Sequence, residues 1–403
     1  MCENAYRYIR IKERNVMDFS RVTDFLETQK DNGIAGCSCM IFKDDEKVYE
    51  HYTGYADLAT KKPIEKDTLF RIYSMTKVIV CTAALQLYER GLYNLNDPLG
   101  MYMPEYAESR VFKTMPNGLV RVMPASTQIT VKDLFTMRAG LTYDDPASRT
   151  GRNIIDMMKR MEEQYPCRTY TTREFAKEMA TIPLAFEPGS HWHYSMCHDV
   201  LGAFIEVISG MTLGEYLKKN IFEPLGMEDT AFHFGEDKLK RLATMYTGKD
   251  GELVPFNHPW DNYGLNSVYE SGGAGLMSTL SDYMKFANTL TRGGTSKDGV
   301  RIIGRKTIDL MRSNHLTDEQ LKDFDWFTQL GYGYGLGVRT LIDKAAGGVN
   351  SSYGEFGWSG MAGTWVAIDP EEKLTAVYMQ QRIPNLEDYT VARLRATIYG
   401  CLD

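Results

Sequence analysis

Apolar and polar positions near the start of the chain follow first a helical and then a strand-like pattern. Residues 16–32 place their apolar side chains along one face, which predicts an amphipathic helix. Residues 35–43 and 47–55 are strand-like runs, and the polar pair Asp44 and Asp45 separates them. A short polar link between two such runs favours a hairpin turn. The sequence therefore predicts a helix followed by a pair of strands.

A nearly all-apolar segment follows Ser74. Its apolar positions include Val78, Val80, Ala83, Ala84, Leu85 and Leu87. A helix that is apolar on all sides is a buried core helix, and Gly91 can end it. The apolar period of residues 199–217 predicts a second long helix. The helical pattern dominates from 74 to about 241, and polar loops such as 144–152 interrupt it.

The pattern becomes strand-like again near the end of the chain. Residues 365–369 and 374–381 read as strands separated by a turn, and residues 389–402 read as a closing helix. Strands at both ends with helices between them imply one sheet built from both ends of the chain. A mainly helical lobe would be inserted between the two halves of that sheet.

The length of the chain agrees with two lobes, since 403 residues exceed a typical single domain. We expect a sheet-containing lobe from 1–73 and 270–403, a mainly helical lobe from 74–269, and a site at their interface. Hydrophobic residues make up 43% of the chain and charged residues 25%, as in an ordinary globular protein. No run of eighteen apolar residues is present, so no transmembrane helix is predicted.

Charge and cysteine content exclude further classes. A net charge of −7 without a run of Lys and Arg argues against a nucleic-acid or anionic-membrane surface. The first twelve positions are rich in charged residues and lack an apolar region, so no secretory signal is expected. The seven cysteines form no CxxC pair, which favours reduced thiols in a cytoplasmic protein. The sequence leaves the oligomeric state open.

The first candidate for chemistry is Ser74-Met75-Thr76-Lys77. On a helix, the Ser74 hydroxyl and the Lys77 amine would share one face about one turn apart. A serine hydroxyl is a poor nucleophile until a base takes its proton, and burial disfavours the charged form of an amine, so a buried lysine can act as that base. The positive end of the helix dipole would also favour negative charge developing on the serine.

Three other site types have weaker support. His191, His193 and His198 cluster with Cys197 and Asp199, as zinc ligands would, but their spacing lacks the HxHxDH signature. An α/β-hydrolase needs Gly-x-Ser-x-Gly, and the candidate at 357–361 fails at its last position. The glycine-rich stretch 331–337 lacks both GxGxxG spacing and a Walker lysine, so a nucleotide loop is not expected there. No metal or organic cofactor is therefore expected.

Several segments in order resemble one known family. The stretch 69–98 resembles the active-site segment of the serine β-lactamase and penicillin-binding-protein-like family, close to class C β-lactamases and the esterases that share their fold. Further similar segments at 129–141 and 272–283 extend the resemblance over about 35–381. The resemblance implies an α+β, β-lactamase/transpeptidase-like fold with an antiparallel sheet flanked by helices, as one family-level domain over about 16–395.

The resemblance also implies roles for individual residues. Ser74 would be the nucleophile. Tyr194, which follows a Pro-Gly turn as in the family's Tyr-x-Asn motif, would move protons with Lys77. The backbone N–H groups of Ser74 and Met361 would form the oxyanion hole and stabilise the tetrahedral intermediate by several kcal/mol. Ser359 would occupy the second position of the family's Lys-Thr-Gly triplet.

Gly360 would occupy the third position of the same triplet. Two other positions depart from the family pattern. Met196 stands where the motif has an asparagine that orients the lysine and binds a substrate amide, and a thioether is only a weak acceptor. Trp358 stands where the triplet has a cation that holds a substrate carboxylate. An indole instead offers an apolar wall suited to an acyl or alcohol group, and related esterases carry tryptophan there.

The sequence therefore predicts a serine hydrolase, and specifically a carboxylesterase that acts through an acyl-enzyme on small or medium acyl esters. Its partner would be a small-molecule ester or amide substrate. A β-lactamase or D,D-peptidase is the alternative enzyme, which Met196 and Trp358 disfavour. A binding or sensing module that acylates slowly or not at all is the alternative from another class.

Overall fold

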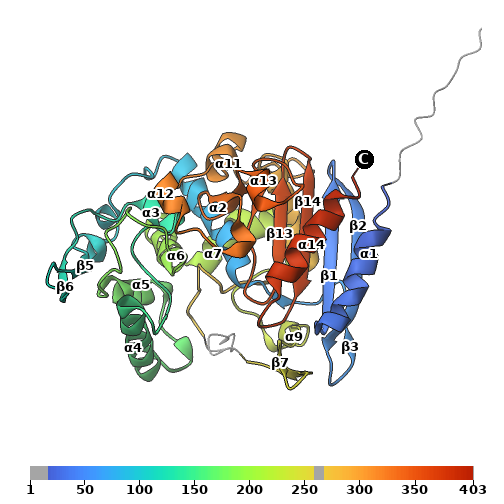
Figure 1. Cartoon of the computed structure of the whole chain (residues 1–403), viewed down its shortest axis with the longest axis horizontal. Coiled ribbons are helices and arrows are strands. Elements are labelled where there is room, and N and C mark those ends of the chain that lie inside the picture. Colours follow the sequence, from blue (N-terminus) through green and yellow to red (C-terminus); the bar gives the residue numbers. More distant parts are fainter. Residues whose placement is uncertain (1–16, 258–266, 403) are drawn as a thin grey trace, which may run out of the picture.

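The protein is built on an eight-stranded antiparallel sheet, which lies in the right half of the view in Figure 1. The computed structural model describes residues 17–257 and 267–402. The strand order β10-β11-β12-β13-β14-β1-β2-β3 places strands from the two ends of the chain side by side. The strands are β1 (Gly36–Lys43), β2 (Glu46–Asp57), β3 (Lys62–Pro63), β10 (Tyr332–Tyr334), β11 (Arg339–Leu341), β12 (Phe356–Gly357), β13 (Trp365–Asp369) and β14 (Leu374–Gln380). The predicted α+β fold with one sheet from both chain ends is confirmed.

Helices cover both faces of this sheet. The helices α1 (Ser20–Glu27) and α14 (Glu387–Tyr399) lie together on one face (Figure 1). The helix α10 (Leu280–Thr291) packs on the other face. Successive side chains of β14 point to opposite faces of the sheet. Ala376 belongs to the core beneath α1 and α14, and Val377 belongs to the larger core on the opposite face.

The larger core is continuous from the sheet into the helical part of the chain. It contains Val377 of the sheet, Val80 of α2 (Thr76–Glu89) and Phe204 of α6 (Cys197–Ser209). Because this core shows no boundary between the two parts, the division into one lobe of residues 1–73 and 270–403 and a second lobe of residues 74–269 stays a prediction.

The remaining elements are short or peripheral. The helices are α3 (Val131–Phe135), α4 (Arg149–Gln164), α5 (Thr172–Ala180), α7 (Leu213–Leu217), α8 (Glu223–Leu225), α9 (Glu236–Leu239), α11 (Arg305–Met311), α12 (Asp318–Leu321) and α13 (Lys344–Gly347). The strand pairs are β4 (Phe70–Arg71) with β9 (Met277–Ser278), β5 (Arg110–Thr114) with β6 (Val120–Pro124), and β7 (Tyr246–Lys249) with β8 (Glu252–Pro255).

The first hairpin forms as predicted. Asp44 and Asp45 link β1 to β2, and both have positive φ angles, 49° and 68°. Positive φ at both central residues is the geometry of a type I′ turn, whose twist matches that of the strands. The helix predicted at 16–32 is α1, followed by a 3₁₀ helix at Thr28–Asn32. Its first predicted residue, Val16, lies outside the described residues.

The single long helix predicted at 199–217 is wrong. The segment forms α6 and α7, which are separated by a break at Gly210 with a φ of 70°. A capping box between Thr212 and Glu215 then starts α7 in a new direction. No single helix among the described residues is long and apolar enough to cross a membrane; α6 and 213–225 pass that test together, with a 73° bend between them.

A second difference is the β5–β6 hairpin, which lies inside the region predicted to be helical. Its strands are mostly exposed and lie at the periphery, far from the central sheet (Figure 1). The closing helix also differs slightly, because α14 begins at Glu387 and ends at Tyr399 rather than spanning 389–402.

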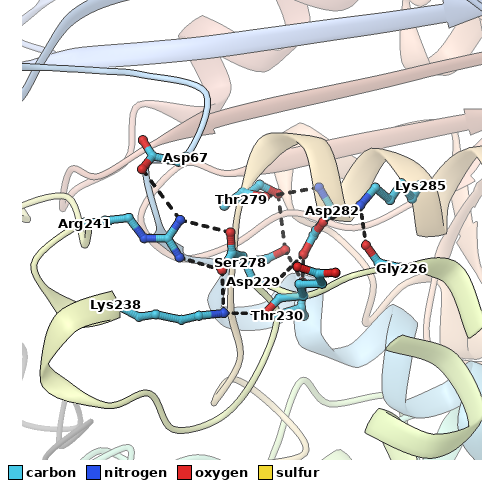
Figure 2. A network of polar contacts seen from close by, with 11 residues as sticks. Asp67, Gly226, Asp229, Thr230, Lys238, Arg241, Ser278, Thr279, Asp282 and Lys285 are labelled. Carbon is cyan, nitrogen blue, oxygen red and sulfur yellow. Dashed lines mark hydrogen bonds and ion pairs between the residues drawn. The ribbon is translucent and has the colours of Figure 1, made fainter. Parts of the chain in front are cut away.

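A polar network fixes the segment that follows α8 to the rest of the protein (Figure 2). The Asp229 carboxylate accepts hydrogen bonds from both terminal nitrogens of Arg241, at 2.5 and 3.0 Å, and from Lys238 at 2.7 Å. The Asp229 N–H donates to Asp282 of α10 at 2.7 Å, and the hydroxyls of Thr230 and Ser278 lie 2.7 Å apart. The network holds the residues that lead into the wall of the cavity described below.

Asp229→Asn is expected to lower the free energy of unfolding at neutral pH by about 1–3 kcal/mol, the usual range for losing hydrogen bonds to a charged group. The hydrogen bonds from Arg241 lower the pKa of Asp229 to about 2. The stabilisation is therefore present above the unfolded pKa of about 4 and is lost as the pH falls towards 2. Urea unfolding should show a difference between wild type and variant that shrinks below about pH 4.

The matched control is Asp237→Asn, since the Asp237 side chain is 97% exposed and its ion pair with Lys240 lies in solvent. Such a pair contributes little, so this variant should unfold like the wild type. A loss for Asp229→Asn that stays constant down to the lowest pH would contradict the proposed charge dependence.

Candidate active site

Ser74 lies in a 3₁₀ turn, Tyr73–Met75, immediately before α2. The sequence predicted a helix beginning at Ser74, whereas the α-helix begins at Thr76. Tyr73 has a φ of 41°, which is rare for a residue with a side chain and is found at strained functional positions. The turn therefore places Ser74 at an irregular helix entrance while Lys77 lies in the first turn of a buried helix.

Lys77 is fully buried, and its amine contacts three acceptors. Nζ donates to Ser74 Oγ at 3.0 Å, to the Tyr143 hydroxyl at 3.1 Å and to the Gly273 carbonyl at 2.7 Å. Three acceptors match the three N–H groups of an ammonium. When the amine is neutral, one nitrogen lone pair becomes available, and the Ser74 hydroxyl is within hydrogen-bonding distance of it.

Tyr194 meets Ser74 from the loop that precedes α6. Its hydroxyl donates to Ser74 Oγ at 2.7 Å, and the indole Nε1 of Trp358 donates to the Tyr194 oxygen at 3.0 Å. The rings of Tyr194 and Trp358 are stacked with centroids 5.5 Å apart. The structure thus brings together four of the predicted site residues. Trp358 is more than the apolar wall predicted, because its N–H would stabilise negative charge on the Tyr194 oxygen.

The two backbone groups predicted to bind an oxyanion have no hydrogen-bond acceptor among the described residues. Within residues 17–257 and 267–402, the N–H groups of Ser74 and Met361 donate to no other group. The segment that carries Met361 approaches the nucleophile closely, since Thr364 Oγ1 donates to the Ile72 carbonyl at 3.2 Å. A Cβ on Gly360 would lie 2.2 Å from Thr364 Oγ1 and 2.5 Å from the Ile72 carbonyl oxygen, so only glycine fits at this position.

Ser359 and Met196 occupy the other two predicted positions. The Ser359 hydroxyl donates to Glu387 Oε1 at 2.6 Å. Met196 is the residue before α6, is 2% exposed and lines the same cavity. Neither residue hydrogen-bonds to Ser74 in the described structure.

Tyr143 is a residue of the site that the sequence did not indicate. Its hydroxyl accepts from Lys77, and burial together with Tyr194 holds the pKa of Tyr143 well above its usual value, so this phenol stays protonated. Tyr143 follows the segment 129–141, which resembles the family, but it precedes a stretch predicted to be a polar loop. Its position in the sequence alone gave no signal that it reaches Lys77.

The structural role of Asp199 was also missed. Asp199 Oδ1 accepts from the hydroxyls of Tyr269 at 2.8 Å and Ser271 at 2.5 Å, and from the Gly273 N–H at 3.3 Å. The carbonyl of Gly273 is the acceptor for Lys77. Asp199 therefore holds the loop that orients the lysine.

A cavity of about 480 Å³ opens at the Ser74 hydroxyl. Its walls are largely aromatic and apolar, with contributions from Tyr143, Phe232, Tyr269, Trp326 and Trp358. A cavity of this size with few polar groups suits a small organic substrate.

The histidine cluster does not form a metal site. His191 lies at the surface, where its Nδ1 is 3.1 Å from Asp323, whereas His198 is fully buried near Cys81 and the Phe135 carbonyl. Burial, with a smaller effect of the Lys77 charge, lowers the pKa of His198 to about 3, so His198 is neutral. In the described part of the chain, no group of three His, Cys, Asp or Glu side chains is placed to hold a metal ion.

Known proteins resemble this chain over nearly its whole length. The family model described as Beta-lactamase matches residues 20–399. Protein Rv1367c of Mycobacterium tuberculosis is 31% identical over 365 residues, which cover 88% of this chain and 87% of that protein. Lovastatin esterase of Penicillium rubens is 29% identical over 399 residues, which cover 92% of this chain and 94% of the esterase. The solved structure of EstCE1, a hydrolase with promiscuous acyltransferase activity, has a TM-score of 0.78 at 24% identity and covers 94% of this chain and 98% of that chain. The last similarity is one of fold.

Proposed function

Because this chain belongs to the beta-lactamase family, we propose that it is a serine hydrolase that forms an acyl-enzyme at Ser74 and cleaves esters of small or medium acyl groups. The proposal rests above all on one observation. Ser74 Oγ lies within hydrogen-bonding distance of both Lys77 Nζ and the Tyr194 hydroxyl, at the entrance to an aromatic cavity. The printed name of one relative, lovastatin esterase, agrees with ester cleavage.

In the first half of the reaction, Ser74 Oγ attacks the ester carbonyl carbon. The proton of Ser74 passes to the pair formed by Lys77 and Tyr194, and the N–H groups of Ser74 and Met361 receive the developing negative charge on the carbonyl oxygen. The C–O bond to the alcohol then breaks. The proton held by the pair passes to the departing oxygen, and the acyl group remains on Ser74.

In the second half, water attacks the acyl-enzyme and gives a proton to the same pair. The bond between the acyl carbon and Ser74 Oγ breaks, the acid is released, and the pair returns the proton to Ser74. The Trp358 N–H supports both halves, because it donates to the Tyr194 oxygen and stabilises the negative charge on that oxygen whenever its proton has passed to a reacting group.

The walls of the cavity favour neutral esters over penicillins and cephalosporins. Those substrates carry a carboxylate, and Trp358 offers no positive charge at the position where the family triplet has one. Met196 likewise offers no amide partner. A carboxylate buried there without a partner would bear a desolvation cost that a neutral acyl group avoids.

We expect the kcat/KM for p-nitrophenyl esters with short acyl chains to be about 100-fold higher than that for nitrocefin. The difference follows because burying the nitrocefin carboxylate without a partner costs a few kcal/mol. The double variant Trp358→Lys with Met196→Asn should shift the ratio towards nitrocefin. If the wild type cleaves nitrocefin as efficiently as esters, Trp358 does not mark an esterase, and Arg168 in the cavity wall is the cation to test next. Absence of any turnover together with absence of labelling would support a binding module.

A further inference from the structure

The largely aromatic cavity wall also contains a polar patch. Ser359, Asn385 and Glu387 line the cavity, and hydrogen bonds join Glu387 to the other two. Glu387 is the first residue of α14, and its Oε1 accepts the hydrogen bond from Ser359 at 2.6 Å. Ser359 is the neighbour of Trp358, whose indole donates to Tyr194. The Glu387 carboxylate therefore lies close to the reacting groups although it takes no part in the mechanism.

Arg339 and Arg395 act on this carboxylate from a distance and lower its pKa, but neither forms an ion pair with it. Among the described residues, no lysine, arginine or histidine forms an ion pair with Glu387 within 4.0 Å. Arg339 is paired with Glu355 at 3.1 Å, and Arg395 lies over the rings of Tyr332 and Trp365. Burial raises the pKa of Glu387, and the hydrogen bond from Ser359 is the largest opposing effect. The carboxyl group lines the cavity and is therefore open to a charged or hydrogen-bonding group of a ligand.

Most of the charged side chains in the cavity wall are acidic. Asp144, Asp199 and Glu387 line the cavity, whereas Arg168 is the one arginine or lysine among the described lining residues. Asp199 already accepts three hydrogen bonds from protein groups. Glu387 also occupies the positive N-terminal end of α14, so that helix end is unavailable to a substrate anion.

We propose that Glu387 sets the charge preference of the site: it disfavours substrates with a carboxylate near the ester and favours those with an ammonium group or another hydrogen-bond donor at the same place. The inference deepens the proposed function and rests on it. Two carboxylates close together in a partly buried cavity repel strongly, whereas an ammonium would form a charge-assisted hydrogen bond with Glu387.

The test uses three phenylboronic acids that bind a nucleophilic serine and differ only in one meta substituent: aminomethyl, methyl or carboxyl. In mildly alkaline buffer, the wild type should bind the aminomethyl compound most tightly and the carboxyl compound least tightly, with inhibition constants that differ by about tenfold per step. Glu387→Gln keeps an acceptor for Ser359 but removes the charge. The inhibition constants of the aminomethyl and carboxyl compounds should then differ by only about twofold, and that of the methyl compound should be nearly unchanged.

The matched control is Asp388→Asn, which changes the net charge equally at the exposed neighbouring residue outside the cavity and should keep the wild-type spread. Equal binding of the aminomethyl and carboxyl compounds by the wild type would overturn the inference whatever the variants do. If the inhibition constants of Glu387→Gln differ among the three compounds as much as those of the wild type, the inference is also overturned. In either case, binding of the methyl compound would still support the proposed serine hydrolase. If no boronic acid binds and no ester is cleaved, the proposed function itself fails, and the inference fails with it.

Discussion

A fluorophosphonate probe should label the protein at Ser74, and Ser74→Ala should abolish both the labelling and the ester turnover. The expected loss is at least about 10⁴-fold, because removing a nucleophile that acts as a unit with its base removes most of the catalytic effect. The only change is the loss of one hydroxyl that lies 3.0 Å from Lys77 and 2.7 Å from Tyr194. Mass spectrometry of the labelled peptide and steady-state ester assays measure the two effects.

Ser267→Ala provides the control, since Ser267 lines the same cavity but has no contact with Lys77 or Tyr194 in the described structure. This variant should keep its labelling and most of its turnover. Labelling at another serine, with activity that survives Ser74→Ala, would overturn the mechanism.

The proton-transfer groups should show a graded series of losses. Lys77→Ala and Tyr194→Phe are each expected to lose about 10²–10⁴-fold in kcat, the usual range for removing a general acid or base. Trp358→Phe should lose less, about tenfold, because it keeps the stacked ring and removes only the N–H that donates to Tyr194. Steady-state kinetics on one short-chain ester checks the series.

Tyr389→Phe controls for the loss of a phenol, since Tyr389 is partly exposed on α14 and should change little. Thermal melting should show that each variant is folded. A Trp358→Phe enzyme slower than Tyr194→Phe would contradict the order, because the N–H that this variant removes acts only through the oxygen of Tyr194.

The predictions from sequence succeeded where neighbouring residues carried the information. The Asp44-Asp45 turn and the strands at 365–369 and 374–381 depend on local alternation and turn residues, and the structure confirms them. The family resemblance is confirmed by the match over residues 20–399. The same ordered motifs correctly indicated that Ser74, Tyr194 and 358–361 would meet, although the catalytic roles of these residues stay predictions.

The failures have physical reasons. The break between α6 and α7 depends on Gly210, and the capping residue Thr212 was a readable signal that the apolar period on either side concealed. The β5–β6 hairpin has little buried surface, so its strands lack the alternation that marks a strand against a core. Tyr143 and Glu387 reach the site only through folding, and no local pattern identifies a contact between residues so far apart in the chain.

The sheet order has a consequence for synthesis of the protein. Strand β1 lies between β2 and β14, and Cys37 is paired with Gln380, near the opposite end of the chain. A ribosome delivers β1 and β2 early and β14 last. Until then one edge of β1 has no partner strand, and the core that β1 shares with α14 is incomplete. Such an edge can pair with a second nascent chain, so we expect the yield of folded protein to fall when β1 stays unshielded during translation.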